Sequence, residues 1–140
     1  MAVTPRRWDV PALKAGAMVS LVFAVPFSIA SRWAADRDDS TLATFLVIGA
    51  VLGFVLGAGC AAWVQGVGLP LSHGIVTAVG TYLAAQAVFV LVRLVRGSEV
   101  RWFALLFNLS VTVGAGLVGG ILGERLQAKG FRPRSMQDAP

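Results

Sequence analysis

The longest uncharged stretch of the chain runs from Ser40 to Val92 and holds 53 consecutive residues without Asp, Glu, Lys or Arg. A helix that crosses a lipid bilayer needs about 20 apolar residues, because that length spans the hydrocarbon core. The stretch is therefore long enough for two such helices and a tight connection. Two glycines and a proline within Gly66–Pro70 interrupt the apolar pattern and predict a turn there. We expect spans at about 42–64 and 71–92.

Two further apolar runs flank this stretch. The first, at about 12–31, carries only Lys14, whose long side chain can reach the headgroup region from one turn inside the span. The second, at about 102–123, begins after Arg101 and ends before Glu124. Tryptophans collect at membrane–water boundaries, and the four in this chain lie at or beyond the ends of the spans: Trp8, Trp33, Trp63 and Trp102. The sequence predicts a single all-α domain, an integral membrane four-helix bundle.

The composition excludes other classes of protein. Hydrophobic residues make up 56% of the chain and charged residues 14%, whereas soluble domains have about 45–50% and about 25%. The net charge of +5 comes from residues that flank the spans, with no basic stripe interleaved with aromatics, so we expect the lipid bilayer and not nucleic acid as a partner. A single cysteine, Cys60, excludes an internal disulfide and a multi-cysteine metal site.

Basic residues also predict the orientation, because Lys and Arg are more frequent in cytoplasmic loops. Four spans place both termini on one side, which holds seven basic residues against five on the other: Arg6, Arg7, Lys14, Arg125, Lys129, Arg132 and Arg134 against Arg32, Arg37, Arg93, Arg96 and Arg101. We expect cytoplasmic termini, a polar cytoplasmic tail at 127–140 and a bacterial inner membrane. The first span could instead be a cleaved signal peptide, although Pro26 and its small residues at a spacing of four favour a packed helix.

The two halves of the chain resemble each other. Gly57–Gln65 reads like Gly119–Gln127, and Leu13–Gly16 reads like Leu71–Gly74. This likeness favours a duplicated helical hairpin whose halves are parallel. The alternative is that any two glycine-rich spans look alike.

Small residues recur on one face of each span. In lipid, helices associate through close backbone approach over such residues. The glycines expected at helix contacts are Gly16, Gly49, Gly53, Gly57, Gly116, Gly119 and Gly123. The same faces would serve homodimerisation equally well, so both uses stay open.

The polar residues inside the last two spans are the main candidates for function. They could form contacts between helices or a polar path for a solute: Thr77, Thr81, Tyr82, Gln86, Asn108 and Thr112. Counted from the span ends at 1.5 Å per residue, Gln86 and Asn108 lie at similar depths of about 9–11 Å, so we expect them to pair.

No catalytic, metal or cofactor site is expected. Every carboxylate lies in a loop, a tail or at a helix end, whereas proton-coupled carriers need an ionisable group inside the membrane. His73, the only histidine, is expected at the same level as Lys14 and Glu124, where a pair could relay protons or sense pH. The alternative is a boundary histidine bonded to a neighbouring backbone carbonyl. We therefore predict that the protein is not an enzyme.

The Pro70–Val76 entry to the third span and the Gly119–Gly123 close of the fourth resemble small four-span membrane proteins of unknown function from Gram-positive bacteria. The resemblance covers roughly residues 12–126 and implies no activity. We expect a protein that acts by helix packing or association, as a homo-oligomer or as an accessory subunit of another membrane protein. The alternative is a small oligomeric channel or passive carrier.

Overall fold

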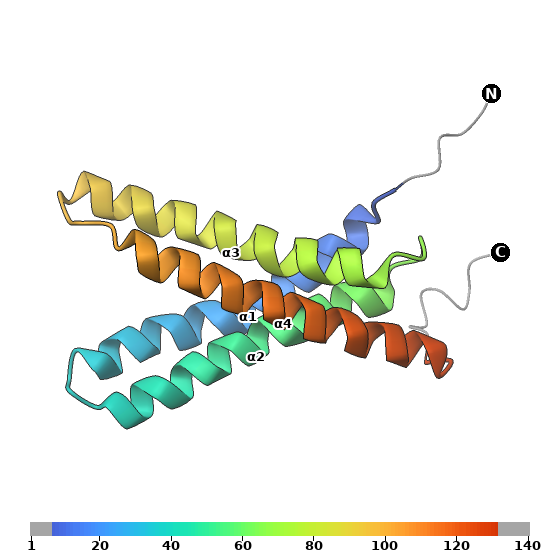
Figure 1. The fold of residues 1–140 in the computed structure, drawn as a ribbon, viewed down its shortest axis with the longest axis horizontal. Helices are drawn as coiled ribbons and strands as arrows, with labels where there is room; N and C mark the ends of the chain where they lie inside the picture. The colour runs from blue at the N-terminus through green and yellow to red at the C-terminus, as the bar shows by residue number, and fades with distance from the viewer. Residues whose placement is uncertain (1–6, 132–140) are drawn as a thin grey trace.

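The computed structural model describes residues 7–131 as four helices, with no strand in that range. These are α1 (Val10–Ala35), α2 (Ser40–Val64), α3 (Pro70–Val95) and α4 (Trp102–Ala128) (Figure 1). The prediction of an all-α chain with four helices is confirmed. Each helix is long and apolar enough to cross a membrane.

Local chemistry explains where the helices begin and end. The carboxylates of Asp9 and Asp39 cap α1 and α2 by accepting a hydrogen bond from the backbone N–H of Ala12 and of Leu42, respectively. Pro70 occupies the first turn of α3, where its missing N–H costs no helical hydrogen bond. Gly97 follows α3 with φ +66°, a conformation that favours glycine. α4 continues to Ala128, so it includes the first two residues of the expected tail 127–140; the part of that tail beyond residue 131 lies outside the described residues.

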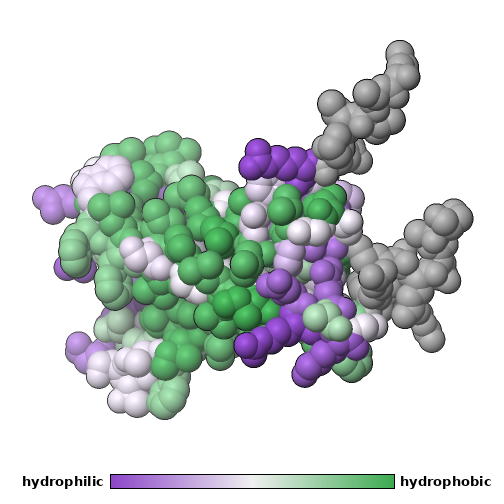
Figure 2. All heavy atoms as spheres, turned by 45° about the vertical axis from the view of Figure 1, so that its right-hand side comes forward, coloured by the Kyte–Doolittle hydropathy of each residue, from purple (hydrophilic) through white to green (hydrophobic). Residues whose placement is uncertain are grey.

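The interior is built from small side chains. Within the described residues, every buried apolar side chain except Tyr82 is an alanine. Large apolar side chains face outward, with Phe45 67% and Phe103 83% exposed. Figure 2 shows a broad hydrophobic surface with hydrophilic residues gathered toward the ends of the molecule. This distribution reverses that of a soluble protein, whose large apolar residues lie inside.

The seven glycines named above lie where helices approach each other. A Cβ atom added to any of them would come within 3.0 Å of a neighbouring helix. At Gly57 the added atom would meet the Ser20 side chain and, at 2.5 Å, the carbonyl oxygen of Gly16. At Gly80 and Gly114, by contrast, it would meet nothing within 4 Å.

The helices form two hairpins, α1–α2 and α3–α4, that cross each other. α2 contacts the three other helices, whereas α1 and α4 do not contact each other along their described lengths. Figure 1 shows the hairpins close together where α1 begins and α4 ends, and apart at the α1–α2 and α3–α4 loops. We call these the terminal end and the loop end of the bundle.

The two hairpins are closed by the same type of contact. In the first, Gly16 of α1 lies against Gly57 and Ala61 of α2. In the second, Gly74 of α3 lies against Gly116 and Gly120 of α4. In each case a glycine fits against two small residues that are four positions apart, and therefore on one face of a helix.

Candidate binding cavity between the hairpins

The divergence of the hairpins leaves two adjoining cavities toward the loop end. The first, of about 180 Å³, is lined by all four helices. The second, of about 480 Å³, lies among the ends of α1 and α3 and the start of α4. Arg32, Gln86, Phe89 and Asn108 line both cavities, so we treat them as one site with two compartments, the inner and the outer cavity.

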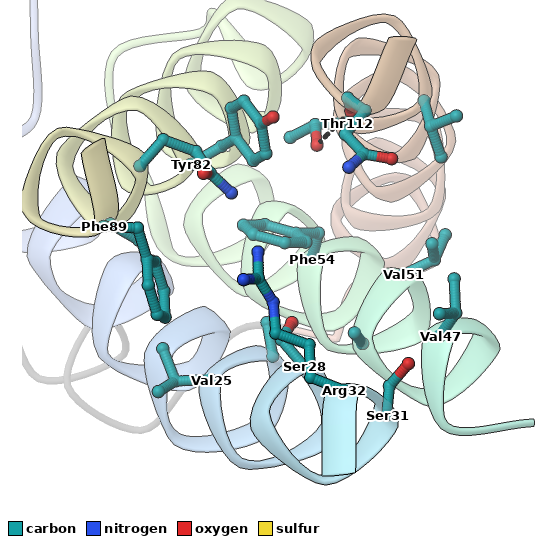
Figure 3. Close-up of a pocket in the computed structure, with 16 residues that line it drawn as sticks. Val25, Ser28, Ser31, Arg32, Val47, Val51, Phe54, Tyr82, Phe89 and Thr112 are labelled. Atoms are coloured by element: carbon teal, nitrogen blue, oxygen red, sulfur yellow. Dashed lines mark hydrogen bonds between the residues drawn. The ribbon is translucent and has the colours of Figure 1, made fainter. Parts of the chain in front are cut away.

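Bulky side chains occupy the level at which the hairpins separate. Phe54 of α2 and Tyr82 of α3 meet edge to face, with ring centroids 6.3 Å apart, and Phe89 lies two turns further along α3. These three rings line the inner cavity (Figure 3), whereas the crossing is built from glycine and alanine. Aromatic rings need far more room than small residues do, so the hairpins stay apart here.

Arg32 extends into this site from the last turn of α1. Side chains on a helix lean toward its N-terminus, so the arginine stem leads the charged group back into the bundle. Its Cζ atom lies 5.2 Å from the centroid of the Phe89 ring, and Figure 3 shows the guanidinium between Phe54 and Phe89. Sequence reasoning missed this role by treating Arg32 only as a flanking charge; its place within the last turn of an apolar helix is the signal that could have revealed it.

The outer cavity is electropositive. Arg32, Arg93 and Arg101 line it together with a single carboxylate residue, Asp36. The Arg93 Nη1 group donates to the carbonyl oxygen of Glu99 at 3.2 Å, and this contact leaves its charge uncompensated. The site therefore joins an apolar inner part to a cationic outer part.

Four of the six predicted polar residues line the inner cavity. The Tyr82 hydroxyl donates to the Leu105 carbonyl oxygen at 2.8 Å and ties α3 to α4, and the Thr112 hydroxyl donates to the Asn108 carbonyl oxygen at 2.8 Å. Gln86 and Asn108 face the same cavity, but their side chains form no hydrogen bond with each other or with another described residue. The predicted Gln86–Asn108 pair is not formed: the two side chains line the same two cavities from neighbouring helices of one hairpin without bonding to each other.

The other two polar residues, Thr77 and Thr81, are buried nearer the terminal end. Their hydroxyl groups have no hydrogen-bond partner, and the same holds for Ser20 of α1. The methyl carbon of Thr77 lies close to Gly16, which places it in the contact between α1 and α3. The six residues thus divide between a closed contact and an open cavity.

At the terminal end, His73 is fully buried under the start of α1. Its Nε2 atom accepts from the backbone N–H of Asp9 at 3.0 Å, and its Nδ1 atom lies 2.8 Å from the carbonyl oxygen of Leu69. Both ring nitrogens are used, whereas Lys14 and Glu124 are exposed. A pair of His73 with Glu124, one of the two that the sequence left open, is not formed, because the crossing places the first turn of α1 over the ring. The other, Lys14 with Glu124, is not formed either, since α1 and α4 are not in contact along their described lengths. The alternative, a bond to the backbone carbonyl of Leu69, is what the structure shows.

Two glutamines complete the terminal end. Gln127 Nε2 donates to the carbonyl oxygens of Trp63 and Gln65 at 2.7 and 2.8 Å. The Gln65 Oε1 atom accepts from the backbone N–H of Val67 at 2.9 Å, and Asp9 accepts from that of Gly66 at 3.1 Å. Side chains thus satisfy the backbone of the α2–α3 loop. Sequence reasoning gave neither glutamine a role, although they occupy equivalent positions in the expected repeat.

Within residues 7–131, no group of three or more His, Cys, Asp or Glu side chains is placed to hold a metal ion. Comparison of the chain with protein-family models, curated proteins and solved structures finds no match to any of them. The geometry of the two ends is therefore the basis for a functional proposal.

Proposed function

We propose that this chain is a multi-pass membrane protein that acts by association, and that the cavity between its hairpins is the site through which it associates. The observation that carries the proposal is the contrast between a closed terminal end and a cavity of about 180 Å³ that all four helices line. If the four helices only had to pack against one another, we would expect them to be in contact along their whole length, without a cavity at one end.

The surface and the helix lengths support a place in the bilayer. Helices of 25–27 residues are about 38–40 Å long, more than the roughly 30 Å of a hydrocarbon core, which suits helices that cross at an angle. Bulky apolar side chains face outward along them, and small residues face inward. We propose a bacterial inner membrane with cytoplasmic termini, and two parallel hairpins that arose by duplication.

The side chains of the cavity favour binding over a reaction. Gln86 and Asn108 bring amides without a protein partner, and such groups are costly in an apolar medium until an occupant bonds to them. The hydroxyl groups of Ser31 and Thr112 donate to backbone carbonyls and not to a general base. A nucleophile needs such a base to become reactive.

A photoreactive residue within the cavity tests this proposal. Val51 lines the inner cavity, and its neighbour Leu52 is 54% exposed on the outside of the same helix, so the two positions form a matched pair. With the full chain in native membranes, we expect Val51→p-benzoylphenylalanine to label one saturable occupant and Leu52→p-benzoylphenylalanine to label bulk lipid. The same unsaturable labelling at both positions would refute the proposal.

The alternative, an oligomeric channel, stays a prediction. Gln86 and Asn108 line both cavities, whereas Thr77 and Thr81 lie in the closed contact, so a path through all six residues requires further copies of the chain. Solute flux into liposomes that disappears in Gln86→Leu and Asn108→Leu would favour it.

A further inference from the structure

We propose that the occupant of this cavity is an anionic phospholipid from the leaflet at the loop end, with its phosphate among Arg32, Arg93 and Arg101 and an acyl chain in the inner cavity. This inference rests on the proposed function, since it names the chemical class that the association site accepts. It follows from the charge, the shape and the position of the two compartments.

Charge complementarity indicates an anion. Of the side chains that line the outer cavity, three carry a guanidinium and one a carboxylate, Asp36. Guanidinium groups bind phosphate oxygens through paired N–H donors, which makes arginine well suited to a phosphate. Arg32 lies over the Phe89 ring and Arg93 bonds to a backbone carbonyl, so neither of these contacts supplies the missing negative charge.

The direction of Arg32 strengthens the argument. An arginine near a helix end can extend outward to the membrane surface, yet the position of Arg32 on α1 and the lean of its side chain bring its guanidinium over the Phe89 ring, in the cavity that Phe54 also lines (Figure 3). Arg32 is exposed, so its guanidinium is accessible to a counter-charge that enters this end of the cavity. A lipid phosphate that enters from the headgroup region supplies one.

The inner cavity suits an acyl chain. Its walls include Val25, Val47, Val51, Phe54 and Phe89. It adjoins the outer cavity at Arg32, which lines both. A volume of about 180 Å³ holds part of a hydrocarbon chain.

Lipid binding to the purified full chain tests the proposal. In nanodiscs of phosphatidylcholine that carry a trace of fluorescent phosphatidylglycerol, we expect the protein to bind phosphatidylglycerol at least tenfold more tightly than labelled phosphatidylcholine. Arg32→Gln should lower that preference about tenfold. Arg32→Lys should lower it less, because it keeps the charge but loses the planar fork.

Arg37→Gln is the matched control. Arg37 lies at the same end of the molecule, but its guanidinium stacks on Trp33 at 3.5 Å and does not line the cavity. The control should bind like the unchanged chain, and thermal unfolding in detergent should show that all variants are folded. Equal binding by the Arg32 and Arg37 variants, or no preference for phosphatidylglycerol, would overturn the proposal.

Two further outcomes separate this inference from the proposed function. Displacement of the lipid by inorganic phosphate at millimolar concentration would assign the arginines to a free anion, and labelling of a second copy from Val51 would assign the cavity to a protein partner. Either result overturns the lipid proposal and leaves the association site in place. The absence of any saturable occupant at Val51 would refute the association site itself.

Discussion

The terminal and loop ends of the bundle are made from the same four helices but differ in how they are filled. At the terminal end, Ala58, Ala61 and Ala78 are completely buried, and His73 and Gln65 satisfy the backbone around them. At the loop end, Phe54, Tyr82 and Phe89 hold the hairpins apart around an open cavity. The comparison shows how side-chain size along a helix can close one end of a bundle and open the other.

Hydrogen bonding follows the same division. The polar side chains His73, Gln65 and Gln127 at the terminal end bond to backbone groups of other segments. Those of Gln86 and Asn108 at the loop end face the cavity without protein partners. The histidine and the two glutamines thus stabilise the fold at one end, although the hydroxyl groups of Ser20, Thr77 and Thr81 in the nearby crossing have no partner. The amides of Gln86 and Asn108 remain available for an occupant at the other end.

The largest effect is expected from filling the crossing. Gly57→Leu would drive a side chain into Ser20 and the Gly16 carbonyl, and overpacking against backbone should lower the free energy of unfolding by about 3 kcal/mol or more. Denaturation in detergent, followed by circular dichroism, measures it. Gly114→Ala is the control, because the added Cβ meets nothing and alanine favours a helix by about 1 kcal/mol. Equal effects of the two changes would contradict the account of the crossing.

A smaller loss of stability is expected at the terminal end when its buried histidine is removed. His73→Ala leaves the Asp9 N–H without its acceptor and opens a void, which should cost about 2–3 kcal/mol. Hydrogen exchange should show faster exchange in the first turn of α1 and in the α2–α3 loop. Unchanged protection there would mean that His73 does not hold these segments together.

The contact between α3 and α4 at the cavity is expected to contribute less. Tyr82→Phe removes the hydroxyl that donates to Leu105 and keeps the ring against Phe54, so it should cost about 1 kcal/mol. The same denaturation experiment measures it. A loss as large as that of His73→Ala would show that the loop end is as closely coupled as the terminal end.

The smallest effect on stability is expected for the cavity amides. Gln86→Leu and Asn108→Leu remove no hydrogen bond within the described chain, so each should change the free energy of unfolding by less than about 0.5 kcal/mol. Their effect should appear in labelling from Val51 or in solute flux instead. A loss of several kcal/mol would indicate that the two residues pair in the folded protein.

The sequence predicts the helices well and the site only in part. The uncharged stretch and the spacing of small residues such as Gly57 are local features of the sequence. The four helices and the faces that carry their small residues can therefore be predicted from the sequence directly. Of the two partners of His73, the Leu69 carbonyl is four residues away and local, whereas the Asp9 N–H is 64 positions away and depends on how the hairpins cross. Arg32 was missed for the same reason, because its neighbours Phe54 and Phe89 belong to other helices.

The account depends most on the claim that the hairpins are closed at their crossing and open beyond it. Ala78 and Ala85 lie seven residues apart on one face of α3, the first fully buried in the crossing and the second lining the inner cavity. In a Cys60→Ala background, a charged water-soluble thiol reagent added from the loop-end side should modify Ala85→Cys at least ten times faster than Ala78→Cys. Equal rates at the two positions would contradict the open cavity and the functions proposed for it.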